Sequence, residues 1–471
     1  MDTKKLRQKI LDLAIRGKLV PQDPNDEPAS VLLERIRAEK EQLIKEGKIK
    51  RSKKSAATDK SHYENVPFEI PESWIWATVE DIAESNIGLT YKPTDICANG
   101  VPVYRSNNIQ NRRICLKELV RVNTNILEKQ YLQEGDLLIC ARNGSRNLVG
   151  KCAIVNNLNE PTSFGAFMAV CRSALNPWIF QILNSEYFNT YLDDSNSTAI
   201  NQVTQKMLLA FQLPIPPAAE QERIISKLKQ WYEYIDEIED RKIELESYIK
   251  QTKYKILDLA ISGKLVSQDP NDEPAIELLK IINPAFQPCD NSHYENLPEN
   301  WCLAKVKDVF VINPRNKAED NTIAGFIPMT LIDDGYSNTF SYEKRKWGAI
   351  KTGFTHFADG DVAVAKISPC LENRKSIVLR DLPNGIGAGT TELHVFRSSV
   401  VSPEYALYFF KSEYFISRCV GTFNGVVGQQ RVGKNIIEEI QIPIPPINEQ
   451  TKIVSTIETI FTQLNTITAE L

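Results

Sequence analysis

The chain contains two copies of itself, and the second copy is circularly permuted. One block, Lys-Ile-Leu-Asp-Leu-Ala-Ile, begins at Lys9 and returns at Lys255, an offset of 246 residues. A second block, Pro-Ile-Pro-Pro followed by Glu-Gln, begins at Pro214 and returns at Pro443, an offset of 229 residues. The copy of the central segment, about 220–265, is therefore in two pieces: its first part lies at the C-terminal end of the chain and its second part at the N-terminal end. Because repeats fix architecture, we expect a bilobed, pseudo-two-fold protein whose termini meet.

Weaker echoes fill the interval between the two blocks in the same order in both halves. Ser-His-Tyr-Glu-Asn at 61–65 returns at 292–296, and Ser-Glu-Tyr-Phe at 185–188 returns at 412–415. This order predicts two globular domains of one fold, while the sequences between the anchor points diverge. Two domains that share these repeated segments but differ in the loops between them favour one task performed on two different targets.

The segments that connect the domains have the pattern of long helices. From Ile224 to Leu259 the apolar residues recur at steps of four and three, and the C-terminal segment repeats this register 229 residues later. Spacing of this kind is typical of a coiled-coil seam, although a stripe that is simply domain core is the alternative. We therefore predict a helix of about 40 residues, roughly 60 Å long, that pairs antiparallel with its copy. The predicted helix seam, which is also the candidate partner-binding surface, consists of Leu228, Trp231, Ile235, Ile238, Ile453, Ile457, Ile460 and Leu464.

Each globular half mixes short β-like runs with helical segments. The runs begin at Asp136, Asp361 and Leu393, and the helical segments are Trp178 to Leu192 and Glu404 to Cys419. This mixture predicts an α+β fold with a small, largely antiparallel sheet. The predicted divisions are an N-terminal helical region with a basic arm (1–60), a first globular domain (61–217), a central region with the spacer helix (218–291), a second globular domain (292–446) and a C-terminal spacer helix (447–471).

Composition and motifs exclude several classes of protein. No stretch of about 18 apolar residues exists, which argues against a membrane span, and nine scattered cysteines without a Cys-x-x-Cys pair indicate free thiols in a reducing cytoplasm. The sequence contains neither a phosphate-binding Gly-x-x-x-x-Gly-Lys-Ser/Thr loop nor a Gly-x-Gly-x-x-Gly motif. The four histidines are not spaced as metal ligands, and Asn283-Pro284-Ala285-Phe286 resembles a methyltransferase motif only superficially, because no cofactor loop accompanies it. We expect a non-catalytic chain with no metal site.

The remaining chemistry is recognition of nucleic acid. The diverging loops are rich in Arg, Lys, Asn and Gln, whose side chains match the donor and acceptor patterns of base edges in the major groove. A net charge of −4 argues against a uniformly basic protein but leaves local basic faces open. The candidate DNA-binding residues are Arg105, Asn107, Asn108, Gln110, Arg112, Arg113, Arg142, Asn143, Arg146, Gln202 and Gln205 in the first domain, and Arg315, Asn316, Lys317, Arg345, Lys346, Lys366, Asn373, Arg374, Arg431 and Lys434 in the second.

One stretch occurs only in the first half. Residues 34–54 hold nine Lys or Arg against four Glu. An arm lying on phosphates and a solvated helix end explain this stretch equally well.

With these motifs in place, the chain resembles the specificity subunit of type I restriction-modification enzymes over essentially its whole length. The resemblance rests on the repeated Lys-Ile-Leu-Asp-Leu-Ala-Ile-x-Gly-Lys-Leu-Val, on the Pro-Ile-Pro-Pro block that ends each domain, and on the permuted helices. The segments Phe326-Ile327-Pro328-Met329 and 365–373 also look like parts of a common type of target-recognition domain.

The resemblance implies a division of labour with other subunits. Each target-recognition domain would read one half of a bipartite, asymmetric site in double-stranded DNA. The paired helices would set the gap and dock two methyltransferase subunits, and two restriction subunits would be added for cleavage, all in the cytoplasm of a prokaryote. This chain would carry no cofactor, and the partners would bring S-adenosylmethionine, ATP and Mg²⁺.

Two alternatives stay open at this point. A protein–protein scaffold would differ from a DNA reader in its salt dependence, since DNA affinity falls steeply as salt rises. A catalytic subunit is the second alternative, and the missing nucleotide and methyl-donor motifs weigh against it.

Overall fold

The computed structural model describes residues 2–47, 66–195, 202–290, 297–422 and 430–471. The chain divides into two compact units, Met1–Asp240 and Arg241–Leu471. The repeated Ser-His-Tyr-Glu-Asn segments and the most basic part of the arm, 48–54, lie outside the described residues.

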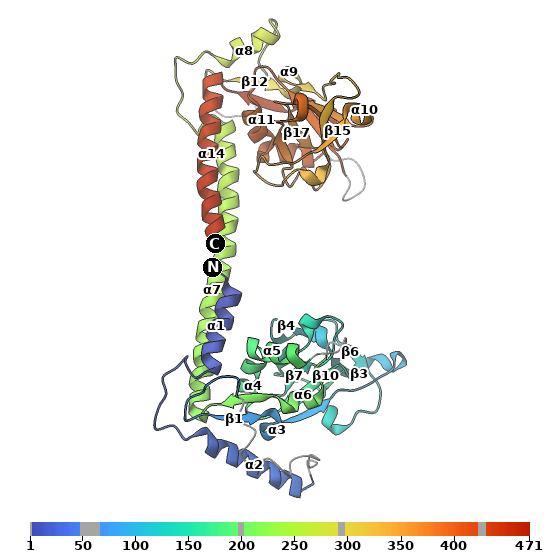
Figure 1. Ribbon diagram of the computed structural model, residues 1–471. Helices are drawn as coiled ribbons and strands as arrows, with labels where there is room; N and C mark the ends of the chain where they lie inside the picture. Colours follow the sequence, from blue (N-terminus) through green and yellow to red (C-terminus); the bar gives the residue numbers. More distant parts are fainter. Residues whose placement is uncertain (1, 48–65, 196–201, 291–296, 423–429) are drawn as a thin grey trace. The chain divides into compact units, whose positions relative to one another are not determined.

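Unit 1 contains an antiparallel helix pair. Helix α1 (Thr3–Ile15) lies along the first part of the long helix α7 (Ala218–Ile261) (Figure 1). Near the start of α1, Arg7 donates to Asp236 and Glu239, whereas Gln22, beyond the end of α1, donates to Glu220 at 2.6 Å. The contacts therefore run in opposite directions along the two helices.

Unit 2 contains the equivalent pair, made from the other two helix segments. Helix α14 (Ile447–Glu470) lies antiparallel to the second part of α7, where Lys253 donates to Asn465 at 2.6 Å (Figure 1). Lys253 and Asn465 are the counterparts of Arg7 and Asp236 at offsets of 246 and 229 residues, so the same helix positions meet in both units. This equivalence confirms the circularly permuted repeat and the antiparallel pairing.

The predicted seam is only partly right. Ile235, Leu228, Ile453 and Ile457 are buried, and Ile460 and Leu464 are partly buried. Trp231 and Ile238, however, are 38% and 40% exposed. The buried face instead passes through Tyr232 and its counterpart Phe461, one residue further along the helix. The heptad pattern was wrong at these two positions because each half of α7 also packs on a globular domain, which shifts the buried stripe toward steps of four.

The globular domain of unit 1 is built from small sheets. Its strand orders are β1-β11, β2-β10-β7-β8, β6-β3-β9 and β4-β5, and all pairs are antiparallel except β3 with β9. The strands are β1 (Ile75–Thr78), β2 (Glu84–Ile87), β3 (Ile96–Tyr104), β4 (Ile109–Gln110), β5 (Arg113–Ile114), β6 (Val120–Val122), β7 (Leu137–Cys140), β8 (Cys152–Ile154), β9 (Ser163–Phe164), β10 (Met168–Arg172) and β11 (Gln212–Ile215). The helices are α2 (Ala29–Lys45), α3 (Val79–Ile82), α4 (Asn176–Leu183), α5 (Glu186–Ser195) and α6 (Gln205–Ala210).

The domain of unit 2 repeats part of this plan: among the described residues its third sheet has four strands where that of unit 1 has three, and the β4–β5 pair has no counterpart. Its orders are β12-β21, β13-β20-β17-β18 and β15-β14-β19-β16, with β14 parallel to β19. The strands are β12 (Cys302–Lys305), β13 (Val311–Ile312), β14 (Ile323–Ile327), β15 (Glu343–Lys346), β16 (Thr355–Ala358), β17 (Val362–Ala365), β18 (Ser376–Val378), β19 (Ile386–Gly389), β20 (Leu393–Arg397) and β21 (Gln441–Ile444). The helices are α8 (Ala275–Ile282), α9 (Val306–Val309), α10 (Trp347–Ile350), α11 (Pro403–Phe410), α12 (Glu413–Val420) and α13 (Lys434–Glu439). This is the predicted α+β, largely antiparallel class.

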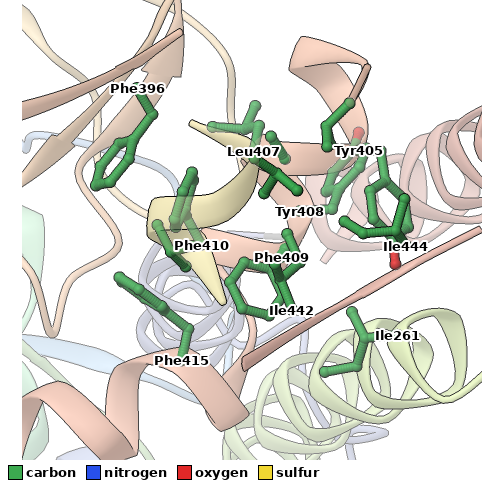
Figure 2. Close-up of a cluster of buried hydrophobic side chains, with 14 of the residues drawn as sticks. Ile261, Phe396, Tyr405, Leu407, Tyr408, Phe409, Phe410, Phe415, Ile442 and Ile444 are labelled. Carbon is green, nitrogen blue, oxygen red and sulfur yellow. The ribbon is translucent and has the colours of Figure 1, made fainter. Parts of the chain in front are cut away.

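The Pro-Ile-Pro-Pro block closes each domain and leads into the helix pair. In unit 1 the first strand, β1, pairs with the last, β11, and Trp178 donates to the carbonyl of Pro214 at 2.8 Å. In unit 2, β12 pairs with β21, and Tyr405 donates to the carbonyl of Pro443 at 2.7 Å. Figure 2 shows Tyr405 in an aromatic core with Phe409, Phe410 and Phe415.

The predicted helical segments are each broken once. A single helix over 178–192 was expected, but α4 ends at Leu183 and α5 begins at Glu186, and α11 and α12 are separated in the same way. The serine in each break is buried, and its hydroxyl accepts from the backbone N–H three residues on, Phe188 for Ser185 and Phe415 for Ser412. A serine cap of this kind starts a new helix and changes the chain direction. Within the described residues, no helix has the length and apolar character needed to cross a membrane.

Candidate nucleic-acid interface

Loops from distant parts of the sequence meet at the carboxyl end of β7 in unit 1. The carbonyl of Phe167, between β9 and β10, accepts from the N–H groups of Ala141 and Arg142 at 2.9 and 3.0 Å. Arg142 also forms a β-bridge with Gln202, and the Asn143 amide donates to the Ser106 hydroxyl at 3.3 Å. We call these loops, residues 105–108, 141–143, 165–167 and 202–205, reading edge 1.

Unit 2 has the same junction at the carboxyl end of β17. The N–H of Lys366 donates to the carbonyl of Glu392 at 2.9 Å, and Ile367 forms a β-bridge with Arg431. Arg431 clamps the Glu392 carboxylate with two hydrogen bonds, at 2.7 and 2.9 Å, and so holds the pKa of Glu392 below its usual range. Reading edge 2 consists of residues 366–368, 390–392 and 430–434.

A buried ion pair anchors the strand that carries each edge. Asp136, just before β7, accepts two hydrogen bonds from Arg172, and Asp361, just before β17, accepts two from Arg397. Both carboxylates are almost completely buried. The two edges thus rest on equivalent Asp–Arg pairs, whereas the loops above these pairs differ.

The structure brings together several predicted residues of the first domain. Arg142, Asn143, Arg105, Asn107 and Gln202 belong to reading edge 1, and Asn107 and Arg142 are exposed there. The Nε atom of Arg105 is buried and has no hydrogen-bond partner among the described residues. Gln110, Arg112 and Arg113 lie around the β4–β5 turn.

Other predicted residues of this domain hold the fold together. Asn108 is fully buried; its carbonyl oxygen accepts from the Arg105 N–H, and its amide donates to the carbonyls of Cys115 and Lys117. Its prediction as a base reader is wrong, because every one of its polar groups is used inside the loop. Gln205 donates to the Ser85 carbonyl, and Arg146 pairs with Asp193.

In the second domain, the structure places the predicted residues in three groups. Lys366, Arg431 and Lys434 belong to reading edge 2. Arg345 and Lys346 lie on β15, an edge strand, where Arg345 covers the Phe326 ring at 3.7 Å. Arg315 and Lys317 are exposed on the loop after β13, and Asn373 is exposed before β18.

Two predicted residues of the second domain serve its interior. Arg374 is 7% exposed; it donates to the Lys411 carbonyl and to Glu413, and it covers the ring of Tyr254 on α7 at 4.5 Å. Its prediction as a DNA contact is wrong, because it fastens the domain to the helix. The Asn316 amide donates to the Phe357 carbonyl, and its oxygen accepts from Arg397.

Comparison with known proteins identifies the family. Residues 71–247 and 298–471 match the type I restriction modification DNA specificity domain. The chain belongs to this family. It is 40% identical over 227 residues to the EcoEI specificity subunit of Escherichia coli, covering 44% of this chain and 38% of that one. The EcoKI specificity subunit of Escherichia coli strain K12 is 25% identical over 85% of this chain and 84% of its own length.

The match to the EcoEI subunit, and a similar one to the EcoAI subunit, therefore spans well under half of those relatives' lengths. Among solved structures, the HsdS subunit of Thermoanaerobacter tengcongensis superimposes with a TM-score of 0.53 at 15% identity, covering 86% of this chain and 93% of that one. A chain from a structure of a type I R-M system gives a TM-score of 0.54 at 15% identity, covering 86% and 94%. These likenesses show that the specificity domains share this fold.

Sequence reasoning missed two residues of these specificity domains. Phe167 is 61% exposed at the tip of reading edge 1, and Glu392 occupies the equivalent place in reading edge 2. An apolar residue in a loop and an acidic residue do not fit a search for base-reading amides and cations. The two residues occupy equivalent positions, 225 residues apart, but differ in chemistry, and this difference is the sequence signal that could have identified them.

The basic stretch 34–54 is partly tied to the first specificity domain. Arg37 pairs with Asp81 at 3.0 Å, Lys40 donates to the Glu80 carbonyl, and Arg35 pairs with Glu27. These described cations are therefore engaged in the fold. No group of three His, Cys, Asp or Glu side chains suited to a metal ion occurs among the residues that the structure describes.

Proposed function

We propose that this chain is a non-catalytic, DNA-binding specificity subunit, and that each domain reads one half of a bipartite, asymmetric site in double-stranded DNA. The observation that supports this proposal is that the two domains share the structure that supports the reading edges but differ in the side chains of the edges themselves. The Asp–Arg pairs, the helix contacts and the strand orders of two sheets repeat between the units, while equivalent positions of the reading edges carry different side chains. Two domains with equivalent supporting contacts and different exposed edges fit the recognition of two different half-sites.

The side chains of both edges have the required chemistry. Arg, Lys, Asn and Gln reach base edges and phosphates, and bidentate contacts discriminate bases by about 1–3 kcal/mol each. Exposed residues of this kind are Asn107 and Arg142 in reading edge 1 and Arg431 and Lys434 in reading edge 2, and Lys317 and Lys346 are exposed elsewhere in the second domain.

The helix pairs fit the proposed docking of partners. Trp231, Tyr234 and Ile238 on α7 are exposed although they are large and apolar, which is typical of a protein-binding surface. We propose that two methyltransferase subunits dock on the helices, that the helices set the gap between half-sites, and that two restriction subunits complete the complex in the prokaryotic cytoplasm. The partners would supply S-adenosylmethionine, ATP and Mg²⁺.

Two measurements test the proposal. Long-read methylome sequencing of a host that expresses the partner methyltransferase, with and without this chain, should show a bipartite methylated consensus only when the chain is present. Binding of the assembled complex to that duplex should fall as salt rises, with a slope set by the phosphates contacted. Binding to DNA that is independent of this chain, or a complex that binds only protein, would refute the function.

A further inference from the structure

Phe167 is held outside the core by a rigid turn. Its neighbours Phe164 and Met168 are completely buried, and the Met168 N–H donates to the Gly165 carbonyl at 2.8 Å, which closes the turn. The Phe167 carbonyl accepts two further hydrogen bonds, from Ala141 and Arg142. The side chain of Phe167 therefore projects from a fixed backbone.

The surroundings of Phe167 are polar. The Arg142 guanidinium lies over the ring, 5.6 Å from its centroid, and Gln202 is bridged to Arg142 through the backbone. A large apolar surface, 61% exposed, is thus placed among side chains that donate to base edges. The one apolar group that a base presents in the major groove is the C5-methyl of thymine, which Phe side chains contact.

The equivalent place in unit 2 has the opposite chemistry. The Glu392 carbonyl accepts from Lys366 just as the Phe167 carbonyl accepts from Ala141, but the Glu392 carboxylate is clamped by Arg431. Arg431 in turn occupies the position of Gln202, because Arg142 bridges to Gln202 and Ile367 bridges to Arg431. Because the supporting contacts are equivalent in both units, we attribute the difference between Phe167 and Glu392 to the bases that each edge contacts.

We propose that Phe167 is a specificity-determining residue of the first domain that contacts the C5-methyl group of one thymine in its half-site. This inference rests on the proposed function. It predicts that the second domain, with Glu392 in this place, makes no such methyl contact there.

The test removes the methyl group and the ring separately. The full chain, assembled with its methyltransferase partner, is titrated with duplexes of its consensus in which each thymine of the first half-site is replaced in turn by deoxyuridine. Burial of one methyl contributes about 0.8 kcal/mol, or about a fourfold change in Kd. One replacement should weaken wild-type binding about fourfold. Phe167→Ala should weaken binding to the unmodified duplex about tenfold and should show no further loss with deoxyuridine at that position.

Matched controls separate this contact from general damage. Leu127→Ala removes another exposed apolar side chain of the same domain, in the turn between β6 and β7, and should leave the deoxyuridine response unchanged. The thermal midpoint of Phe167→Ala should equal that of the wild type, since the ring is mostly exposed.

The inference is overturned if no thymine of the first half-site responds to the loss of its methyl group, if the half-site has no thymine, or if Phe167→Ala retains the wild-type response. An equal loss on cognate and unrelated duplexes also overturns it. A wild-type complex that binds all duplexes alike contradicts the proposed function instead.

Discussion

A buried tryptophan–glutamate contact at the start of each long helix offers a quantitative test of the repeated frame. In unit 1 the indole N–H of Trp74 donates to Glu220 at 2.9 Å, and in unit 2 Trp301 donates to Glu449 at 2.9 Å. Both carboxylates are almost fully buried, and burial raises the pKa of each. Replacing either tryptophan by phenylalanine removes a donor from a buried carboxylate.

The loss should be large and the same in both units. A hydrogen bond to a charged group contributes about 1.5–3 kcal/mol, and the smaller ring removes about 1 kcal/mol of packing. We expect Trp74→Phe and Trp301→Phe each to lower the free energy of unfolding by about 3 kcal/mol. For a unit of roughly 240 residues, this corresponds to a fall in Tm of about 6–12 °C in the unit concerned.

Calorimetry of the wild type and of both variants measures this fall. Glu220→Gln provides the control, because Trp74→Phe in that background should lose less than in the wild type if the indole–carboxylate bond carries the effect. A loss below 1 kcal/mol in either unit, or losses that differ between units by more than about 1 kcal/mol, would refute the reasoning that the two frames are energetically equivalent.

Three further predictions follow from individual contacts. Burial lowers the pKa of His394 to about 4, so between pH 6.5 and 4 only the unfolded chain takes up a proton at this residue. The free energy of unfolding, measured by urea denaturation, should therefore fall by about 3 kcal/mol on acidification through this window. A His394→Gln variant whose free energy of unfolding falls just as steeply with pH would contradict this. Arg431→Ala, which breaks the clamp on Glu392, should alter the methylated consensus in the second half only, and a change in the first half would count against independent edges. Insertion of seven residues after Asp240 adds about 10 Å to α7, or about three base pairs at roughly 3.4 Å each, and leaves the contacts of α1 and α14 with α7 intact. Methylome sequencing should then show a longer gap between the half-sites. An unchanged gap in an active variant would show that α7 does not set the spacing.

The sequence was sufficient for the architecture because the repeat constrains both ends of the chain at once. The offsets that relate Lys9 to Lys255 and Pro214 to Pro443 also relate Arg7 and Asp236 to Lys253 and Asn465, which touch in the structure. The seam was harder to predict. Tyr232 packs on the buried face with its ring, whereas the heptad register had placed its neighbour Trp231 in the seam, and Trp231 is exposed.

The candidate site was predictable as a set of loops but not residue by residue. Divergence between the copies located most of the loops that meet at the reading edges, but not 165–167 or 390–392, and residue type alone did not separate exposed Arg142 from buried Arg374. That difference depends on long-range packing, since Arg374 is covered by Tyr254 of α7 and by Tyr336 and donates to Glu413. Phe167 was missed for the converse reason: its exposure comes from a turn whose hydrogen bonds join separate segments.

Exchange of one domain tests whether the two domains read separate half-sites. Residues 61–217 would be replaced by the corresponding domain of a relative with a known site, and the methylated consensus would be read by long-read sequencing in the presence of the partner methyltransferase. We expect one half of the consensus to change to the donor's half-site while the other half and the gap stay as they were. A change in both halves, or an unchanged consensus in an active complex, would contradict this expectation.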